Sequence, residues 1–97
     1  MEQAVGLKFE WHPGKAKQNQ RKHNVSFAEA STVFADPLSA TAFDPDHSDE
    51  EDRYIIVGFS NHERLLIVSY TERVDRIRII SARELTPLER QEYEEEI

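Results

Sequence analysis

The chain has 97 residues, no cysteine and a formal net charge of −7 at pH 7. This length suits one domain over residues 1–97 with one core, and the absence of cysteine excludes a disulfide scaffold, a thiol nucleophile and a cysteine zinc site. No segment has the ~20 consecutive apolar residues of a membrane span, and residues 1–6 lack the regions of a secretion signal, so we expect a cytoplasmic protein without membrane contact.

The charged residues are unevenly distributed along the chain. Five basic residues and one acid lie between Lys8 and His23, and six arginines and three acids lie between Arg53 and Arg83. The acids concentrate in residues 44–52 and 84–97. The net charge argues against a simple nucleic-acid binder, but this distribution predicts a local cationic surface on an acidic protein.

The N-terminal part of the chain predicts a strand and a polar helix. Residues 7–11 alternate apolar and polar side chains, as in a half-buried strand. Pro13 suits the first position of a helix that continues to about His23, and Asn24 suits a left-handed helix stop. His12 and His23 then flank this helix as its cap and as a charge partner of its C-terminus.

A capping box at residues 26–29, Ser-Phe-Ala-Glu, indicates a second helix. In such a box the serine side chain accepts from the Glu29 amide, and the Glu29 carboxylate returns to the N–H group of the cap. Residues 36–37, Asp-Pro, end this helix. Its apolar side chains repeat at helical spacing and predict a packing stripe made of Phe27, Ala30, Val33 and Phe34.

The second half of the chain predicts an antiparallel meander and a last helix. Residues 40–43 form a short β-like piece, and residues 44–52 form an acidic loop. Three strand candidates follow, at residues 53–60, 65–71 and 76–83. Thr86 and Glu89 form another capping box, with Pro87 at the first helical position. We expect an α+β fold of the order β-α-α, antiparallel β-meander and C-terminal helix. The first two helices are expected to cover one sheet face, and the arginines to lie on the other.

Several motifs occur together in an order and spacing that resemble one protein family. The first are Phe-Glu-Trp-His-Pro-Gly-Lys at residues 9–15, Asn19, and Lys-His-Asn-Val-Ser-Phe at residues 22–27. Later motifs lie at residues 36–37, 46–48, 51–53, 58–60, 71–73 and 78–83. Over residues 7–93 the chain resembles the BrnT family of bacterial type II toxins, although His12 and Asn24 stand where that family usually has Asp and Gly.

The resemblance has implications for fold, activity and partners. It implies a RelE-like fold and a ribonuclease that halts growth. It also implies neutralisation by a cognate BrnA-type antitoxin, whose ribbon-helix-helix segment binds operator DNA. The toxin itself then contacts that DNA only through the antitoxin.

Four arginines are the candidate catalytic residues. Metal-independent RNA cleavage uses the ribose 2′-OH as nucleophile and passes through an anionic phosphorane, which a preorganised cation cluster stabilises. The planar fork of arginine binds phosphate oxygens in pairs. We expect these four side chains to converge on the open face or rim of the sheet, near the start of the acidic loop. They are Arg53, Arg73, Arg78 and Arg83.

His47 is the candidate general acid or base, because a histidine titrates near neutral pH and the acids around it favour its protonated form. Glu51 is an alternative base. The four histidines have no helical metal-ligand spacing, so we expect no intrinsic metal and no cofactor. Candidate contacts to the RNA backbone, without sequence preference, are Lys15, Arg21, Lys22 and Arg76.

Two other interpretations of the same residues stay open. An arginine on an exposed strand face often contributes only solubility and edge protection, and an exposed ion pair contributes little. The chain is then a non-catalytic interaction module that binds an acidic or amphipathic partner, or an inactive toxin homologue that acts only in autoregulation with the antitoxin. RNA cleavage that is lost on changing arginines to alanine distinguishes the toxin from both.

Overall fold

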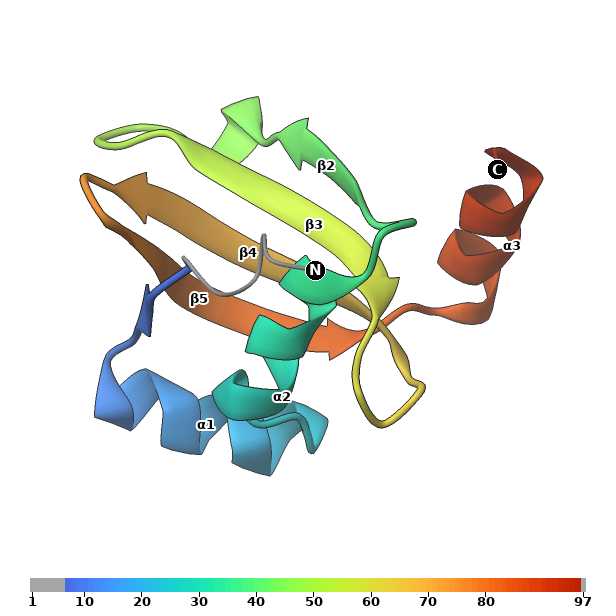
Figure 1. The fold of residues 1–97 in the computed structure, drawn as a ribbon, viewed down its shortest axis with the longest axis horizontal. Helices are drawn as coiled ribbons and strands as arrows, with labels where there is room; N and C mark the ends of the chain where they lie inside the picture. Colours follow the sequence, from blue (N-terminus) through green and yellow to red (C-terminus); the bar gives the residue numbers. More distant parts are fainter. Residues whose placement is uncertain (1–6, 97) are drawn as a thin grey trace.

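The computed structural model describes residues 7–96, so the expectation of no secretion signal in residues 1–6 lies outside the described part. A five-stranded sheet forms the centre, in the order β1-β5-β4-β3-β2 (Figure 1). β1 is parallel to β5, and the other neighbours are antiparallel. The elements are β1 (Phe9–Glu10), α1 (Pro13–His23), α2 (Phe27–Thr32), a 3-10 turn (Val33–Ala35), β2 (Ala40–Phe43), a 3-10 turn (Pro45–His47), β3 (Arg53–Phe59), β4 (Leu65–Arg73), β5 (Arg76–Glu84) and α3 (Pro87–Glu96).

The predicted mixed α+β fold with a C-terminal helix is confirmed, and several strand ends differ from the prediction. β1 covers only Phe9 and Glu10, and β3 ends at Phe59, one residue earlier than predicted. β4 extends further, to Arg73, because a two-residue turn is enough to connect it to β5 at residues 74–75. β5 also extends one residue further than predicted, to Glu84. The longer β4 places Arg73 in the paired part of the sheet, opposite Arg76.

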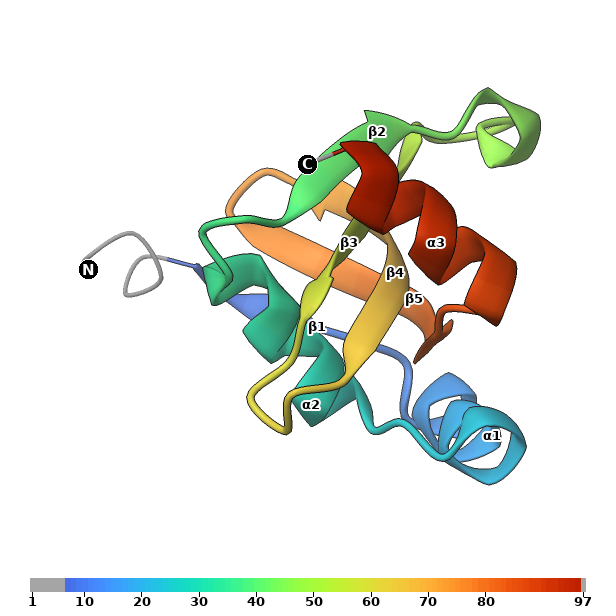
Figure 2. The same cartoon turned by 90° about the vertical axis from the view of Figure 1, so that its right-hand side faces the viewer.

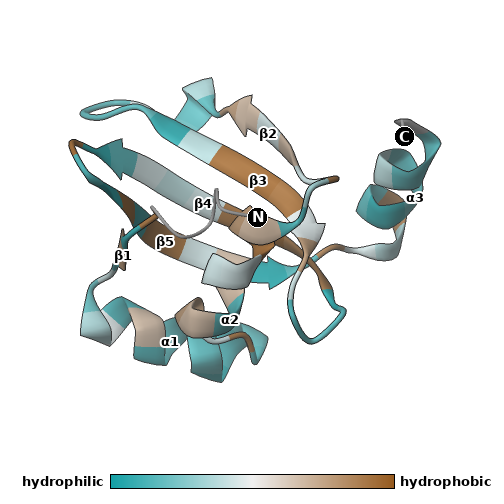
Figure 3. Cartoon of the chain, in the orientation of Figure 1, coloured by the Kyte–Doolittle hydropathy of each residue, from teal (hydrophilic) through white to brown (hydrophobic). Residues whose placement is uncertain are grey.

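Both predicted ends of α1 are confirmed. The Nδ1 atom of His12 accepts from the backbone N–H of Gly14 at 3.0 Å and of Lys15 at 3.4 Å. Asn24 adopts the left-handed conformation, with φ of 58° and ψ of 36°, and its N–H donates to the Gln20 carbonyl. The helix itself is hydrophilic over most of its surface (Figure 3), so side-chain hydrogen bonding must contribute to its attachment.

Asn19 attaches α1 to the edge of β5 beyond the point where β1 ends. Its buried side-chain amide donates to the Ala82 carbonyl at 2.8 Å and accepts from the Ala82 N–H at 3.1 Å. The same amide donates to the Val25 carbonyl at 3.0 Å. Asn19 thus bonds both backbone groups of Ala82, as a neighbouring strand would. Without Asn19 these buried groups would lack partners, at a cost of about 1–3 kcal/mol for each group.

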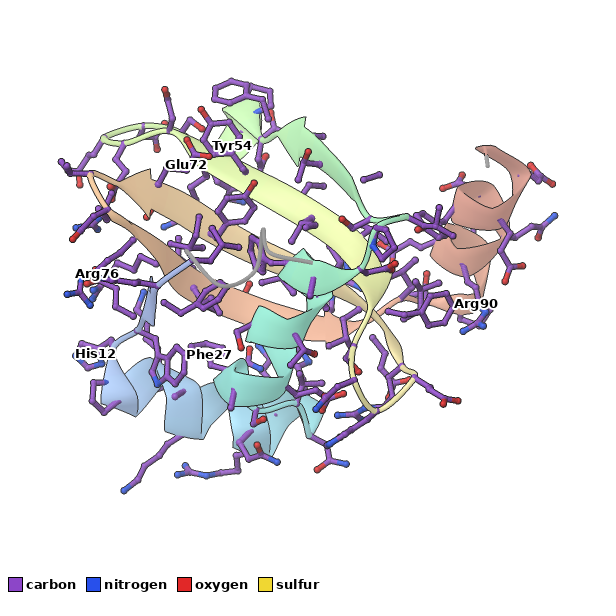
Figure 4. All side chains as sticks on the ribbon, in the orientation of Figure 1. His12, Phe27, Tyr54, Glu72, Arg76 and Arg90 are labelled. Atoms are coloured by element: carbon purple, nitrogen blue, oxygen red, sulfur yellow. The ribbon has the colours of Figure 1, made fainter. Side chains whose placement is uncertain are left out.

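The core lies between α2 and one face of the sheet. Phe27 and Val33 are buried there, and Figure 4 shows Phe27 between the helix and the strands. Burying such a side chain stabilises the fold by about 1.5–3 kcal/mol. Tyr70 is 5% exposed and packs edge-on against Phe34, with ring centres 5.0 Å apart. Its burial raises the pKa of the Tyr70 phenol.

The capping box of α2 forms only in part. Ser26 Oγ accepts from the Glu29 N–H at 3.0 Å, but the Glu29 carboxylate does not return to the cap. Instead Glu29 accepts from Arg64 Nε at 3.0 Å and from Ser60 Oγ at 2.6 Å. Arg64 also donates to the Asn24 carbonyl at 2.9 Å. A charged partner binds a buried carboxylate more strongly than a neutral N–H does, so the reciprocal bond predicted from the sequence is replaced by this network.

Asp36 and Gly58 hold the segment between α2 and β2 against β3. The Asp36 carboxylate accepts from the N–H of Leu38 at 3.0 Å and of Phe59 at 2.8 Å. A Cβ atom on Gly58 would lie 2.9 Å from Asp36 Oδ2 and 2.9 Å from the Ser39 Cβ. Glycine is therefore required for this close approach, and two of the motifs at residues 36–37 and 58–60 have a structural role.

α3 lies on the sheet face opposite α2 (Figure 2), and only at one end of the sheet (Figure 1). Tyr93 donates its hydroxyl to the Leu38 carbonyl at 3.0 Å, and the Arg90 guanidinium lies 6.0 Å from the centre of the Phe59 ring. Figure 4 shows Arg76 at the opposite end of the sheet from Arg90. α3 therefore leaves the end near the β4–β5 turn uncovered. No helix within residues 7–96 is long and apolar enough to cross a membrane.

Candidate functional site

The sheet face opposite α2, here called the open face, carries arginines on adjacent strands. Thr71 of β4 pairs with Arg53 of β3 on one side and with Arg78 of β5 on the other, and Arg78 pairs with Glu10 of β1. Paired residues of neighbouring strands project from the same face. Strands lie about 4.8 Å apart, so the Arg53 and Arg78 backbones are roughly 10 Å apart, a span that two arginine side chains can close around one anion. We call Glu10, Arg78, Thr71 and Arg53 the arginine row.

The ion pairs of the open face differ between its arginines. Arg78 Nη1 lies 2.9 Å from a Glu10 carboxylate oxygen, and both side chains are about one-third exposed. Arg73 Nε lies 3.0 Å from Glu51 Oε2. Within residues 7–96 the Arg53 guanidinium forms no ion pair. Arg53 therefore keeps its donors available for an external anion.

The loop before β3 forms a shallow cavity of about 330 Å³ beside Arg53. His47 is largely exposed, and its Nδ1 atom lies 2.9 Å from Asp44 Oδ2. Ser48 Oγ donates to the Asp44 carbonyl at 2.6 Å and accepts from the Arg53 N–H at 2.9 Å, which ties the loop to the strand. The cavity is lined by Asp46, His47, Asp49, Glu50, Glu51 and Arg53. The structure thus brings the predicted acid or base, His47, next to one predicted arginine.

Two of the predicted backbone-binding residues on α1 lie together. Lys15 and Lys22 line a cavity of about 240 Å³ between α1 and β5, and Ser81 forms its other wall. Arg21 is exposed and does not line this cavity. Arg76 pairs with Arg73 across the β4–β5 hairpin and lines another cavity at its turn. Basic side chains therefore border the arginine row on its α1 side and at the hairpin.

Arg83 does not join the arginine row, contrary to the expected convergence of four arginines. It lies five residues beyond Arg78 on β5, roughly 15 Å away at about 3.3 Å per residue, and pairs with Ile67. Its guanidinium donates to both carboxylate oxygens of Glu89, at 2.8 and 3.0 Å. Glu89 also accepts from the Thr86 N–H at 2.9 Å and donates its own N–H to Thr86 Oγ1 at 3.2 Å, as the capping box of α3 predicts.

The Arg83–Glu89 pair changes the acidity of both groups. The hydrogen bonds from Arg83 are the main cause that lowers the pKa of Glu89, from 4.5 to about 2. Glu89 in turn raises the pKa of Arg83. The two side chains are about equally exposed, at 39% and 36%. In this conformation Arg83 holds the start of α3, and Glu89 occupies its Nη1–Nη2 edge.

Sequence reasoning missed two members of the arginine row. Thr71 is 1% exposed, and its Oγ1 atom has no hydrogen-bond partner within residues 7–96. Glu10 was noted only within a strand, although it neutralises Arg78. Tyr70 and Thr71 are consecutive in β4 and project to opposite faces of the sheet. Alternation alone therefore predicts that Thr71 lies on the arginine face, but only the strand register identifies its neighbours.

His12 and His23 lie at the two ends of α1, as predicted. His12 caps α1, and His23 is the last residue of that helix. His62 lies in the β3–β4 turn, with Nδ1 3.5 Å from Glu29 Oε1. In the described part of the chain no three His, Asp or Glu side chains form a group suited to a metal ion. The alternative base Glu51 is engaged by Arg73, as its 3.0 Å ion pair shows.

The chemistry available at this face is electrostatic and acid–base. Two guanidiniums on either side of one strand position can bind the oxygens of a single phosphate and stabilise extra negative charge on it. A histidine that lines the same cavity as one of them can act as a proton donor or acceptor. The arrangement suits reactions in which charge develops on a phosphate group.

Comparisons with known proteins agree with this chemistry. Residues 11–89 match the family model described as the ribonuclease toxin BrnT of a type II toxin–antitoxin system. The crystal structure of the Brucella abortus ribonuclease toxin BrnT has a similar fold, with a TM-score of 0.61, 20% sequence identity, and coverage of 82% of this chain and 97% of that one. The comparison with curated protein sequences gave no significant match. Because the family match spans most of the sequence, the chain belongs to the BrnT family of ribonuclease toxins of type II toxin–antitoxin systems.

Proposed function

We propose that this chain cleaves RNA without a metal ion, using arginines of the open face to bind and stabilise the reacting phosphate. The observation that carries the proposal is the register that sets Arg53 and Arg78 on either side of Thr71. Arg73 lies two residues further along β4 on the same face. Family membership supports RNA as the substrate.

In the proposed reaction the 2′-oxygen of the ribose attacks the adjacent phosphorus while its proton passes to a base. The 5′-oxygen leaves as it receives a proton, so the products are a 2′,3′-cyclic phosphate and a 5′-hydroxyl. Arg53 and Arg78 stabilise the pentacovalent phosphorane, and each such donor contributes about 3 kcal/mol in a preorganised site. His47, which lines the same cavity as Arg53, exchanges protons with the reacting oxygens.

The RNA backbone is proposed to continue from the arginine row toward α1. Lys15 and Lys22 line the cavity between α1 and β5 and supply sequence-independent phosphate contacts. Arg21 and Arg76 add exposed positive charge at the two borders of this path. Arg83 is assigned to the attachment of α3 instead of catalysis, because Glu89 occupies its fork.

An antitoxin partner follows from the family, since type II systems pair a protein toxin with a protein antitoxin. We propose a cognate BrnA-type antitoxin with a ribbon-helix-helix segment, so that operator DNA is contacted only through the antitoxin. We further propose that the fold is RelE-like and that the toxin acts in the cytoplasm. Co-purification with the product of a neighbouring short reading frame tests this partner.

The test of function is cleavage of total RNA by the purified chain in excess chelator, together with growth arrest on expression. The wild-type chain is expected to cleave RNA, and Arg53→Ala/Arg78→Ala is expected to abolish both cleavage and growth arrest. Arg90→Ala, at an exposed pair on α3, is the matched control and is expected to retain both. Full activity of the double variant would refute the assignment.

One observation favours the non-catalytic interaction module as a second candidate. Three of the four predicted arginines already have carboxylate partners, in the pairs Arg73–Glu51, Arg78–Glu10 and Arg83–Glu89. Such a surface exchanges internal ion pairs for those of an acidic partner peptide. Tight complex formation without RNA cleavage at any enzyme concentration would select this function.

A further inference from the structure

Thr71 is the most buried member of the arginine row. Its side chain projects from the open face between Arg53 and Arg78, and it is 1% exposed. Its Oγ1 atom is buried and has no hydrogen-bond partner within residues 7–96. Buried hydroxyl groups in folded proteins nearly always have a partner, so this one requires an explanation.

The neighbours of Thr71 show which kind of partner is missing. A hydroxyl both donates and accepts, whereas guanidinium groups only donate. No described carboxylate hydrogen-bonds the Thr71 hydroxyl. Of the two acids that pair with arginines of this face, Glu10 binds Arg78 and Glu51 binds Arg73. The Thr71 hydroxyl can therefore donate its proton to an acceptor. Since the two neighbouring arginines attract negative charge, an anion is the acceptor that suits this position.

We propose that Thr71 Oγ1 is a third donor of the arginine row and hydrogen-bonds an oxygen of the RNA phosphodiester held by Arg53 and Arg78. The inference rests on the proposed function, because it deepens the description of the same site. Arg53 and Arg78 are long, partly exposed side chains, so they turn toward a bound anion without any change in the sheet. The anion then satisfies the hydroxyl that the unliganded chain leaves without a partner.

The alternative explanation is that the threonine only fills space in the sheet. Valine has nearly the same shape without the hydroxyl, and serine keeps the hydroxyl without the methyl group. Thr71→Val and Thr71→Ser therefore separate the chemistry of this position from its packing. The two variants are compared for melting temperature, for the rise in melting temperature caused by inorganic phosphate, and for RNA cleavage in excess chelator.

Thr71→Val is expected to melt at or above the wild-type temperature, because it removes a buried hydroxyl without a partner. Its cleavage rate is expected to fall about ten- to a hundredfold, the effect of losing one hydrogen bond to a charged group. Its phosphate-induced rise in melting temperature is expected to shrink. Thr71→Ser is expected to recover both the cleavage rate and the phosphate effect.

Three results would overturn the inference. The first is a clearly lower melting temperature of Thr71→Val, which would show that the hydroxyl already has a structural partner. The second is wild-type cleavage by Thr71→Val while Arg53→Ala/Arg78→Ala is inactive, which leaves the proposed function intact. If the wild-type chain cleaves no RNA, the proposed function fails, and the rise in melting temperature caused by phosphate tests the inference instead. An unchanged rise in Thr71→Val is the third overturning result. Loss of the rise in Thr71→Val supports an anion site.

Discussion

Two arginine environments on this small molecule differ in how completely their donors are used. Arg64, in the network of the β3–β4 turn, donates to Glu29, to Glu84 and to the Asn24 carbonyl. Arg53, in the arginine row, forms no ion pair within residues 7–96. A guanidinium whose forks are filled by buried carboxylates stabilises the fold, and one with free forks is available to bind a ligand.

Arg83 combines features of these two environments. It is partly exposed like an open-face arginine, yet Glu89 binds both sides of its fork. The same residue type at neighbouring positions thus has different expected roles, and partners rather than location decide among them. We call Arg64 and Arg83, whose donors are taken by carboxylates, filled arginines, and Arg53, which forms no ion pair within residues 7–96, a free arginine.

The largest difference is expected between two glutamates that each bind one arginine. Glu29→Ala removes the buried carboxylate that accepts from Arg64 and from Ser60. It is expected to lower the free energy of unfolding by about 3 kcal/mol, because it breaks a buried ion pair and leaves the buried Ser60 hydroxyl without its acceptor. Glu29 is 4% exposed, whereas Glu51, the partner of Arg73, is 45% exposed. Glu51→Ala, the matched control, is expected to change the free energy of unfolding by less than about 0.5 kcal/mol. Urea denaturation of both variants measures the contrast, and equal losses would remove the distinction.

The next effect is on the attachment of α3. Arg83→Met keeps the aliphatic part of the side chain and removes the bidentate pair with Glu89. We expect a loss of about 1 kcal/mol in stability, the typical upper value for a partly exposed ion pair. Hydrogen exchange at the amides of α3 is expected to accelerate, with no change in β4. Unchanged exchange in α3 would show that Tyr93 and Arg90 suffice to hold the helix.

The loss of stability at low pH is expected to come from the carboxylates that bind Arg64 and Arg83. The pKa values of Glu29 and Glu89 are lowered by their arginine partners, that of Glu89 from 4.5 to about 2. Both carboxylates therefore stabilise the folded state fully above their ordinary pKa. The contribution of Glu89 is lost as the pH falls from about 4.5 toward 2, and that of Glu29 is lost as the pH falls through its lowered pKa. Urea denaturation at pH 7, 5 and 3.5 measures the loss. Glu89→Gln is expected to reduce the pH dependence below pH 4.5, and an unreduced slope would argue against the pair.

The smallest effect is expected from Glu10, the partner of Arg78 in the arginine row. Glu10→Gln removes the negative charge 2.9 Å from the guanidinium and frees it for phosphate. We expect RNA binding to strengthen about two- to threefold at low salt, a gain that screening removes at high salt. Fluorescence anisotropy with a short RNA at two salt concentrations measures this change. Weaker binding would mean that Glu10 orients Arg78 for the ligand.

The elements that could be predicted from the sequence depend on local interactions. The caps at His12 and Thr86 and the left-handed stop at Asn24 follow from the chemistry of neighbouring residues. The reciprocal bond of the Ser26 box did not form because its glutamate found Arg64, 35 residues away in the chain. A local pattern contains no information about such a competitor.

The placement of the arginines needed information that one strand does not contain. Strict alternation along β5 puts Arg78 and Arg83 on opposite faces, since they are five residues apart. The register shift next to Ser69 and Tyr70 leaves Ile80 as an extra residue, and this bulge returns Arg83 to the open face. The arginine row and the buried hydroxyl of Thr71 likewise depend on pairing between distant segments.

The most direct test of the account compares two double variants in one RNA cleavage assay with excess chelator. Arg53→Ala/Arg78→Ala removes the free and the weakly held arginine of the row, and Arg83→Ala/Glu89→Ala removes a filled arginine with its partner. We predict that the first loses cleavage about a thousandfold or more while remaining folded, and that the second cleaves within about threefold of the wild type. Retained cleavage by the first variant with loss in the second would contradict the assignment of catalysis to the arginine row.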